Sequence, residues 1–551
     1  MVFIVKKTIS GKEYYYLNEN KRVDGKVKTK TLAYLGKDRK EAEKKKKEFI
    51  ENMGNEKIVI GEKEVKKEYN LKSEKISIEE LANFCKRKGF VFRSSDIYGG
   101  FAGFWDFGHL GIEMFKNLKD NWWSHFVTSK ENMVGMEASI ISHPRTWKAS
   151  GHLTSFKDIA VICKKCKKAT KIDVSEEGKV KCECGGEYEK QGEFNLLFKT
   201  NVGALDSEVA FLRGETAQAM FMDFKLVQQT SRMQLPFGIA QIGRCFRNEI
   251  APRDFLFRCR EFHIGELEFF LNPEDKKCEL LDKEHLNLKF KFLDEETQKK
   301  GEEDLKEVSI KELLSKNKLG EWQGYWLAEQ IFWFYDLGLK EIKIREHMKN
   351  ELSHYSSATF DVDYEYPFGS LEVAGNANRG QFDLTNHQNE SKEKMEIFDE
   401  KSGKKVLPRV IEPTFGMERV FLAVLVKAYS KNEKGEIVLK LLPKLAPVKA
   451  AIFPIVKQPE FEKISENVFN DLKKEFNVVY DKSGSIGRRY ARNDEIGTPF
   501  CITIDGDSVK NKDVTVRDRD TTKQIRVKVS ELKNKLRELI NGEIEFSSAG
   551  S

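Results

Sequence analysis

The sequence has no run of about 18 apolar residues, so we expect no helix that spans a membrane. Its first seven residues become charged too soon to form a secretory signal. With 40% hydrophobic and 33% charged residues, the 551-residue chain has the composition of a soluble globular protein. These absences favour a cytoplasmic protein with no membrane partner, and the length requires about two to four domains.

The sequence offers no disulfide framework either. It has nine cysteines, four of which form two close pairs, Cys163 with Cys166 and Cys182 with Cys184. Two thiolate pairs at turn-like spacing are what a tetrahedral zinc site requires, although the second pair has one intervening residue instead of the usual two. We predict a structural Zn²⁺ ion in an insertion at about residues 160–190. The alternative is a pair of reduced cysteine clusters without metal.

Net charge is almost absent beyond the N-terminus. Residues 1–40 hold 11 lysines and arginines against 4 acidic residues, an excess of +7 that equals the excess of the whole chain. Strands are predicted at 12–17 and 28–35, joined around Asp24 and Gly25, followed by a helical pattern at 38–53 and a polar linker at 54–74. Residues 1–74 therefore form a basic module. It is either a solvated appendage or an RNA-contacting unit that uses tyrosines and lysines together.

Three short segments contain the residue types of a nucleotide site. Residues 246–249 (FRNE) are followed after eight residues by 258–262 (RCREF), and residues 416–419 (GMER) lie far downstream. Arginines can form forked hydrogen bonds to phosphate oxygens, a glutamate can accept from an adenine amine, and an aromatic ring can lie under a base. Single arginines and glutamates are usually only solvated, but this ordered set is hard to explain in that way.

The set resembles the signature of class II aminoacyl-tRNA synthetases. Residues 247–262 are similar to motif 2 of that class and residues 416–419 to motif 3. A predicted helix at 108–126, a strand at 138–142 and Pro144 resemble motif 1, which forms the dimer interface. Residues 212–218, 375–379 and 412–416 resemble segments of the glycyl-tRNA synthetase family. The resemblance runs from about residue 75 to about 540 and implies a homodimer.

The resemblance implies an α/β (α+β) fold. Residues 75–444 would form the class II antiparallel sheet flanked by helices, with a helical insertion at about 271–345 that either touches the tRNA acceptor stem or is solvated. Residues 445–551 would form a mixed α/β anticodon-binding domain, which the alternation of strands and helices also indicates. Arg488, Arg489 and Arg492 lie in a predicted loop of this domain. They would contact the tRNA anticodon or form an ordinary charged loop.

The implied reaction is the ATP-dependent attachment of glycine to tRNA(Gly). Glycine would first form glycyl-adenylate, and the 3′-terminal adenosine of the tRNA would then accept the glycyl group. Neither step needs a protein nucleophile, so positioning and cations, including Mg²⁺, are expected to carry the catalysis. One alternative is a non-catalytic, synthetase-like nucleic-acid-binding subunit, which should have lost the ATP-site residues. Another is a class II synthetase for a different small amino acid.

By this resemblance the catalytic residues are Arg247, on the α-phosphate and the glycine carboxylate, and Arg419, over adenine and toward the γ-phosphate. Glu249 would read the adenine amine, Phe262 would stack on the base, and Arg258 would hold the terminal phosphates. The predicted ATP site comprises Arg247, Asn248, Glu249, Phe257, Arg258, Cys259, Arg260, Glu261, Phe262, Glu372, Val373, Gly416, Met417, Glu418 and Arg419. Within it, Glu372 occupies the family's acidic position for magnesium, and the nearby Glu412 would bind either the metal ion or the glycine amine.

A glycine pocket needs negative charge for the ammonium group and too little room for a methyl group. Glu215, Glu266 and Glu412 would supply the charge, and Thr414 a hydroxyl group. The predicted pocket comprises Glu215, Phe262, His263, Ile264, Gly265, Glu266, Glu412, Pro413, Thr414, Phe415 and Gly416. Exclusion by size makes an editing domain less necessary, and the sequence contains none that we recognise.

Overall fold

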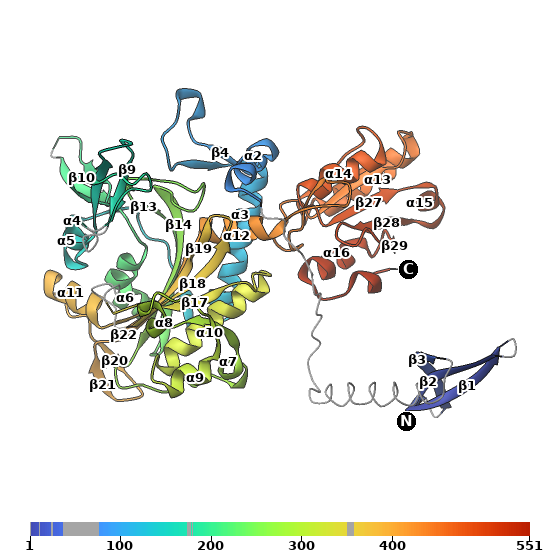
Figure 1. Ribbon diagram of the computed structural model, residues 1–551, viewed down its shortest axis with the longest axis horizontal. Coiled ribbons are helices and arrows are strands. Elements are labelled where there is room, and N and C mark those ends of the chain that lie inside the picture. The colour runs from blue at the N-terminus through green and yellow to red at the C-terminus, as the bar shows by residue number, and fades with distance from the viewer. Residues whose placement is uncertain are drawn as a thin grey trace. The chain divides into compact units, whose positions relative to one another are not determined.

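The structure is a computed structural model that describes residues 2–9, 12–23, 26–36, 76–172, 178, 180–205, 207–349 and 358–550. The chain divides into two compact units, Met1–Tyr69 and Asn70–Ser551. Figure 1 shows the second unit as a large sheet with flanking helices and a smaller α/β domain. Among the described residues, no helix is both long and apolar enough to cross a membrane.

The first unit contains an antiparallel three-stranded sheet in the order β1 (Val2–Ile9), β2 (Lys12–Val23) and β3 (Lys26–Gly36). Val23 pairs with Lys26, so β2 and β3 form the predicted hairpin. The predicted turn at Asp24 and Gly25 lies outside the described residues. β1 was not predicted. The predicted helix at 38–53 and the linker at 54–74 lie outside the described residues.

The catalytic region of the second unit is built on a nine-stranded sheet in the order β16-β15-β17-β18-β19-β22-β14-β13-β6. Neighbouring strands are antiparallel except β13 with β6 and β15 with β17. The strands are β6 (Met133–Gly135), β13 (Phe237–Phe246), β14 (Glu261–Leu271), β15 (Lys289–Leu293), β16 (Lys306–Ser309), β17 (Lys343–Glu346), β18 (Ala358–Tyr366), β19 (Gly369–Gly380) and β22 (Arg409–Gly416). This antiparallel-rich sheet flanked by helices confirms the predicted fold class.

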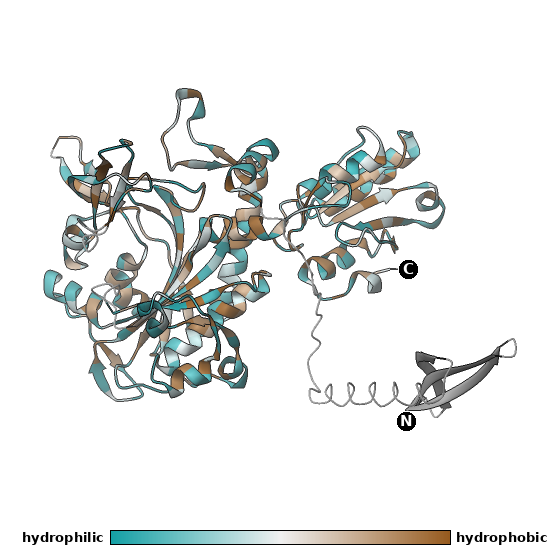
Figure 2. Cartoon of the chain, viewed as in Figure 1, coloured by the Kyte–Doolittle hydropathy of each residue, from teal (hydrophilic) through white to brown (hydrophobic). Residues whose placement is uncertain are grey.

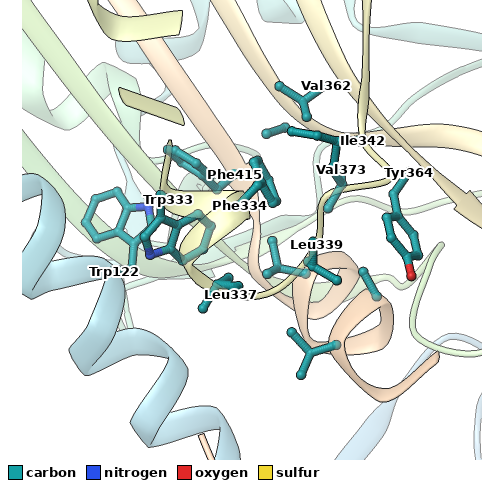
Figure 3. Packing of buried hydrophobic residues seen from close by; sticks show 14 of the residues in the cluster. Trp122, Trp333, Phe334, Leu337, Leu339, Ile342, Val362, Tyr364, Val373 and Phe415 are labelled. Carbon is teal, nitrogen blue, oxygen red and sulfur yellow. The ribbon is translucent and has the colours of Figure 1, made fainter. Parts of the chain in front are cut away.

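Three helices pack on one face of this sheet: α3 (His109–Trp123), α10 (Glu321–Asp336) and α12 (Met417–Ala428). Figure 3 shows Trp122 of α3 and Trp333 of α10 close together beside Phe415 of β22. Their ring centroids lie 5.7 Å and 5.2 Å from that of Phe415. Because Phe415 immediately precedes Gly416, this core fixes the start of α12. The hydrophobic residues along the central strands and α12 appear brown in Figure 2.

The predicted helical insertion at 271–345 is wrong in part. Strands β15 and β16 of this segment extend the catalytic sheet, and β17 begins inside it. Its longest helix, α10, is buried around most of its circumference, and Trp322, Trp326 and Trp333 are all buried. A helix with this pattern belongs in a core and not on a solvated surface.

The opposite face of the sheet is covered at one end by α6 (Ala217–Ser231) and α11 (Phe382–Ser391). The predicted motif 1 helix corresponds to α3. The predicted strand at 138–142 is reduced to β7 (Ile141–Ser142), which pairs with β12 (Glu208–Leu212), and Pro144 begins the short helix α4 (Pro144–Ala149). The uncovered part of this sheet face contains the candidate site.

The C-terminal domain is a five-stranded mixed sheet in the order β26-β25-β27-β28-β29, as predicted. The strands are β25 (Ala450–Pro454), β26 (Val478–Tyr480), β27 (Phe500–Ile504), β28 (Asp513–Asp518) and β29 (Gln524–Lys528). The helices are α13 (Pro459–Leu472), α14 (Ile486–Glu495), α15 (Gly506–Asn511) and α16 (Leu532–Asn541).

Candidate active site

A cavity of about 370 Å³ lies where the β13–β14 hairpin meets β22 and α12. Pairing sets this meeting point, because Cys245 lies opposite Phe262 and Ile264 lies opposite Gly416. The predicted residues that line the cavity are Arg247, Glu249, Phe257, Arg258, Cys259, Phe262, His263, Ile264, Glu372, Thr414, Gly416, Glu418 and Arg419. Residues 247–262 and 416–419, which are far apart in the sequence, thus form one site, as the motifs predict.

Arg247 is held by a carbonyl group and two rings. Its Nε donates to the Gly214 carbonyl oxygen at 3.0 Å, and its guanidinium carbon lies 5.3 Å and 5.4 Å from the ring centroids of Phe156 and Phe262. In the described part of the chain, neither terminal Nη nitrogen of Arg247 has a hydrogen-bond partner. A planar cation held in this way can offer both Nη groups to an anion.

Arg419 closes the other side of the cavity. Its guanidinium carbon lies 4.5 Å from the Phe257 ring centroid, and its Nη1 donates to the Glu372 carbonyl oxygen at 2.9 Å and to Oε2 at 3.1 Å. A Cβ atom at Gly416 would lie 3.0 Å from the Arg419 Cδ atom, so a larger residue there would displace the Arg419 side chain. Arg258 and Arg419 also line a neighbouring cavity of about 700 Å³, so the two cavities share both cationic groups.

Carboxylates suited to Mg²⁺ lie beside these arginines. Asp363 of β18 pairs directly with Glu372 of β19, and both residues line the larger cavity. Burial raises the pKa of Asp363 to about 6, so a cation nearby would favour its charged form. Hard oxygen donors next to a phosphate site fit Mg²⁺.

Several predicted ATP residues do not line the cavity. Asn248 is exposed and uses its backbone N–H to bond the Leu196 carbonyl, and Glu261 pairs with Arg244. The Arg260 guanidinium donates to the carbonyl oxygens of Glu249 and Ala102. Val373 and Met417 are core residues. These five residues adjoin cavity residues in the sequence or the sheet but do not line the cavity themselves.

Glu418 has a structural partner in the site. Its carboxylate accepts from the His263 backbone N–H at 2.7 Å and lies 2.7 Å from the His263 Nδ1. The pair is mostly buried and ties the start of α12 to β14. Glu418 and His263 therefore join motif 3 to motif 2, and their polar groups already satisfy each other.

The predicted glycine residues divide between the two faces of the sheet. Phe262, Ile264 and Thr414 face the cavity. Gly265 and Phe415 face the core instead, because side chains alternate along a strand; a Cβ atom on Gly265 would lie 3.2 Å from Trp122. Pro413 alternates with Thr414 in the same way. The inclusion of these three positions in the pocket is therefore wrong.

Glu215, Glu266 and Glu412 are buried next to the cavity, and each has fixed partners. Glu412 accepts from Arg379 Nη1 at 2.7 Å. Glu266 accepts from the Thr216 backbone N–H at 2.8 Å and from the Thr216 hydroxyl group. Because these partners hold them, the three carboxylates cannot move aside for a larger ligand.

Glu215 has its own set of partners. Its Oε2 lies 3.1 Å from His152 Nε2, and its Oε1 accepts from Gln218 at 2.9 Å. Burial raises the pKa of Glu215, but His152 and Arg379 outweigh burial and hold the pKa well below its usual range. Glu215 is therefore ionised at neutral pH.

The sequence missed four residues of this cluster: His152, Glu268, Arg379 and Asp383. Arg379 is central, because it also donates to both Asp383 oxygens at 2.7 Å and 2.8 Å. Arg379 lies in residues 375–379, which resemble a segment of the glycyl-tRNA synthetase family. That resemblance was the only feature of the sequence that could have indicated its role. Phe156 comes from a segment with no motif, so nothing in the sequence could have placed it beside Arg247.

Glu268 is fully buried on β14, and neither of its carboxylate oxygens has a hydrogen-bond partner among the described residues. Burial raises its pKa well above the usual range, and it raises the pKa values of Glu266 and Glu412 as well. With Glu215 and Asp383, five buried carboxyl groups gather around Arg379. Arg379 cannot neutralise all five in their ionised forms, so burial favours the protonated forms of some of them, and a small ammonium group beside them would favour their charged forms.

The four predicted zinc ligands come together in an insertion formed by β8 (Lys157–Cys163), β9 (Ala169–Ile172) and β10 (Tyr188–Asn195). The sulfurs of Cys163, Cys166, Cys182 and Cys184 all lie within 4.8 Å of one another, and two pairs are 3.5 Å and 3.6 Å apart. Ligands about 2.3 Å from a tetrahedral zinc ion would lie about 3.8 Å apart. The one-residue gap therefore does not prevent convergence, and the cluster fits zinc.

Arg488, Arg489 and Arg492 lie on the helix α14 and not in a loop. Arg489 is buried and donates to the carbonyl oxygens of Pro454 and Gly484, so it cannot contact RNA. Arg492 is paired with Asp481, whereas Arg488 is exposed. The predicted three-arginine surface is thus reduced to one exposed arginine and one paired arginine.

Comparisons with known proteins agree with this geometry. Residues 449–539 match the family described as "Anticodon binding domain". The chain is 39% identical to the glycine–tRNA ligase of Borrelia hermsii over 85% of this chain and 98% of that protein. It is 41% identical to the glycine–tRNA ligase of Caldanaerobacter subterraneus over 84% of this chain and 98% of the other.

A similar fold is found among solved structures. The prolyl-tRNA synthetase from Cryptosporidium parvum, complexed with halofuginone and AMPPNP, matches with a TM-score of 0.52 and 16% identity. The match covers 84% of this chain and 75% of that one. At this identity the likeness shows the fold alone.

Proposed function

Because this chain belongs to the glycine–tRNA ligase family, we propose that its cavity activates glycine with ATP and that the enzyme transfers the glycyl group to tRNA(Gly). One observation carries the proposal: two arginines line one cavity, and a cluster of buried carboxyl groups adjoins it where Glu266 pairs with the cavity residue Thr414. The arginines suit the phosphates of ATP, and the carboxyl groups suit an ammonium group with no side chain beside it. An intact ATP site argues against a non-catalytic relative.

In the first step the glycine carboxylate attacks the α-phosphorus of ATP. The bond to the pyrophosphate oxygen breaks, and glycyl-adenylate remains. Arg247 binds the α-phosphate and the carboxylate with its Nη groups, and the rings of Phe156 and Phe262 keep its plane fixed. Negative charge that builds up on the phosphoryl group is stabilised without movement of this arginine.

The other residues of the nucleotide end position ATP. Phe262 lies under adenine, Glu249 accepts from its amine, and Arg258 and Arg419 bind the terminal phosphates. Glu372 and Asp363 would hold Mg²⁺, which neutralises phosphate charge when it is bound. In the second step a ribose hydroxyl of the terminal adenosine attacks the glycyl carbonyl carbon, AMP leaves, and the hydroxyl proton is released.

Charging of tRNA(Gly) with labelled glycine tests the proposal. Wild-type enzyme should form acid-precipitable glycyl-tRNA only when ATP, glycine and tRNA(Gly) are all present. Arg247→Ala protein serves as the control, because it keeps the zinc cluster and the C-terminal domain but lacks the central cation. A wild-type enzyme that charges no tRNA with glycine would contradict the proposal.

We also propose that two copies of the chain form a homodimer through the region that resembles motif 1. The sheet β11 (Lys199–Val202)–β12–β7 exposes Ile141, Val202 and Val209. The adjoining helix α6 contacts α4 through Met222 and Thr146, and it exposes Met222 and Leu226. A connected apolar surface supports a protein interface. Sedimentation should give twice the 63.7 kDa chain mass, and a monomer at micromolar concentration would contradict it.

The cysteine cluster supports a structural zinc ion, because four thiolates leave no open position for catalysis. Metal analysis should find about one zinc per chain in wild-type protein. A Cys182→Ser/Cys184→Ser variant should contain none, whereas Cys278→Ser should match wild type. Purified wild-type protein without zinc would contradict this assignment.

We propose a cytoplasmic location. All nine cysteines are free thiols, which suits a reducing compartment. Fractionation of the source cells should recover the protein in the cytosol, and recovery with secreted proteins would exclude this location.

A further inference from the structure

His152 is a buried histidine that contacts the amino-acid end of the site. It begins the short helix α5 (His152–Ser155), and its residue surface is 4% exposed. Its Nε2 atom lies 3.1 Å from Oε2 of Glu215. An ionised carboxylate only accepts hydrogen bonds, so we assign a proton to Nε2 of His152. Glu215 thus receives a hydrogen bond from a side chain that the proposed mechanism does not use.

Neighbouring groups fix the orientation of the His152 ring. Its Nδ1 atom lies 2.8 Å from the hydroxyl oxygen of Ser150, which is also buried. The Asn195 side chain donates to the backbone carbonyl oxygens of His152 and Leu153 at 2.9 Å and 3.2 Å. Because both the backbone and the second ring nitrogen are held, Nε2 stays directed at Glu215.

The same ring is in contact with the nucleotide end of the site. The His152 ring meets the rings of Trp147 and Phe156 edge to face, with centroids 5.2 Å and 5.1 Å apart. The Phe156 ring centroid lies 5.3 Å from the guanidinium carbon of Arg247. Edge-to-face contacts favour one relative orientation of two rings. His152 therefore touches Glu215 directly and is linked to Arg247 through one phenyl ring.

A second connection joins Glu215 to Arg247 through the backbone. The Arg247 Nε donates at 3.0 Å to the carbonyl oxygen of Gly214, the residue before Glu215. A closed chain of contacts is thus formed by Glu215, His152, Phe156, Arg247 and Gly214. Because the chain is closed, the separation of Glu215 and Arg247 is restricted from two sides.

We propose that His152 is a positioning residue that holds Glu215 and Arg247 at the separation required by the ammonium and carboxylate groups of one glycine molecule. The inference rests on the proposed function, in which Arg247 binds the glycine carboxylate and buried carboxyl groups attract the ammonium group. His152 does not line the cavity, so it acts through these two residues. Displacement of a positioned group by about 1 Å can lower a rate about 100-fold.

The charge of Glu215 makes this link measurable as a pH dependence. Burial raises the pKa of Glu215, but His152 and Arg379 outweigh burial and lower it. The other ionisable groups around this carboxylate are Glu266, Glu412, Cys245 and, through Gln218, Asp383. Loss of the His152 hydrogen bond would raise the pKa of Glu215. Glycine binding would then weaken as pH falls through the raised pKa, because protonated Glu215 does not attract an ammonium group.

Two substitutions at His152 break the link at different ends. His152→Phe keeps a ring beside Phe156 but removes Nε2. Its KM for glycine in ATP–pyrophosphate exchange should exceed the wild-type value about tenfold at pH 6 and less than about threefold at pH 8.5, with kcat within about twofold. His152→Gln keeps an N–H donor for Glu215 but removes the ring. Its kcat should fall about tenfold, and its KM for glycine should stay within about threefold at both pH values.

His285→Gln is the matched control. His285 lies on α7 (Lys283–Asn287) and is also a buried histidine, with its Nε2 3.0 Å from the buried Glu329, but it does not line the cavity. Its kcat, its KM for glycine and their pH dependence should match wild type.

Ser150→Ala keeps the test open if the His152 variants do not fold. It removes only the hydroxyl group at Nδ1, so KM for glycine should rise about threefold at pH 6 and less at pH 8.5. An unchanged KM in this variant would overturn the proposal.

Equal losses of kcat, with the same pH-independent change in KM, in His152→Phe and His152→Gln would overturn the proposal, because His152 would then act only through packing. Wild-type constants in either variant would also overturn it. Wild-type protein without glycine-dependent exchange would instead refute the proposed function. Normal wild-type exchange that both variants retain unchanged refutes only the positioning role.

Discussion

The two ends of the active site handle opposite charges in different ways. At the nucleotide end, Arg247 and Arg419 contact rings and carbonyl oxygens, and only Arg419 is paired with a carboxylate. At the amino-acid end, Glu266 and Glu412 are buried in a cluster with a single central cation, Arg379. The first end keeps positive charge available for phosphates. The second holds more carboxyl groups than its cation can neutralise, so it lacks one ammonium group.

At both ends of the active site, like charges gather where a substrate of opposite charge would arrive. The two ends differ in burial: the glutamates lie in the core of a sheet, where desolvation makes each unneutralised charge costly. A single neutral substitution of a buried glutamate is therefore expected to weaken glycine binding strongly. A single substitution at the nucleotide end should weaken ATP binding less, unless it removes a group that contacts the reacting phosphate.

The largest effect is expected from Arg247→Ala. It removes the only cation between the Phe156 and Phe262 rings, so the rate of ATP–pyrophosphate exchange should fall by about 10² to 10³-fold or more. Arg488→Ala is the matched control, because this arginine is exposed on α14 in the C-terminal domain, and its rate should equal wild type. If the exchange rate of Arg247→Ala is within tenfold of the wild-type rate, Arg247 does not have the proposed catalytic role.

The second effect concerns the amino-acid end alone. Glu412→Gln removes a buried carboxyl group beside Arg379 that a bound ammonium group would ionise, so KM for glycine in the exchange assay should rise about 10- to 100-fold. KM for ATP should stay within about twofold of wild type. Equal increases in both KM values would show that the two ends are not separate, and the comparison would fail.

A smaller effect is expected at the ring beneath adenine. Phe262→Leu keeps an apolar side chain but removes the stacking surface, so KM for ATP should rise about tenfold. Phe257→Leu tests the ring beside Arg419 in the same way. An unchanged KM for ATP in Phe262→Leu would place adenine elsewhere in the cavity.

The smallest effect is on stability and not on activity. Burial raises the pKa of Glu268, so the folded state retains a proton that the unfolded chain releases. Stability is then lost as pH rises from the unfolded pKa toward the folded pKa. Glu268→Gln needs no proton, so its melting temperature should exceed that of wild type by about 1–3 °C at pH 8 and by less at pH 5.

KM for glycine in Glu268→Gln should match wild type, because glutamine resembles the protonated acid. A stability difference that does not grow with pH would show that Glu268 is ionised in the folded protein. A raised KM for glycine would instead place its charge in the pocket.

The sequence was most informative where function depends on short segments. Arg247, Phe262 and Arg419 were assigned to one site because each lies in a motif with fixed spacing, and one cavity contains all three. Which side chains of a strand face the cavity and which face the core was harder to predict from sequence alone. Gly265 and Phe415 adjoin pocket residues in the chain but face the core.

Residues that depend on pairing between distant strands were missed. Arg379 reaches Glu412 because β19 pairs with β22, with Ala377 opposite Glu412. The local sequence around Arg379 does not predict which residues of β22 pair with β19. Arg489 was misread for a related reason: a run of arginines predicts a solvated surface, but backbone carbonyl groups of neighbouring loops and strands accept its hydrogen bonds and bury it.

The most direct test of the two-ended site is the amino-acid dependence of ATP–pyrophosphate exchange by the wild-type enzyme. A pocket walled by carboxyl groups that fixed partners hold in place predicts rapid exchange with glycine and rates at least 100-fold lower with alanine or serine. Exchange that is absent with glycine, or equally rapid with alanine, would contradict the account.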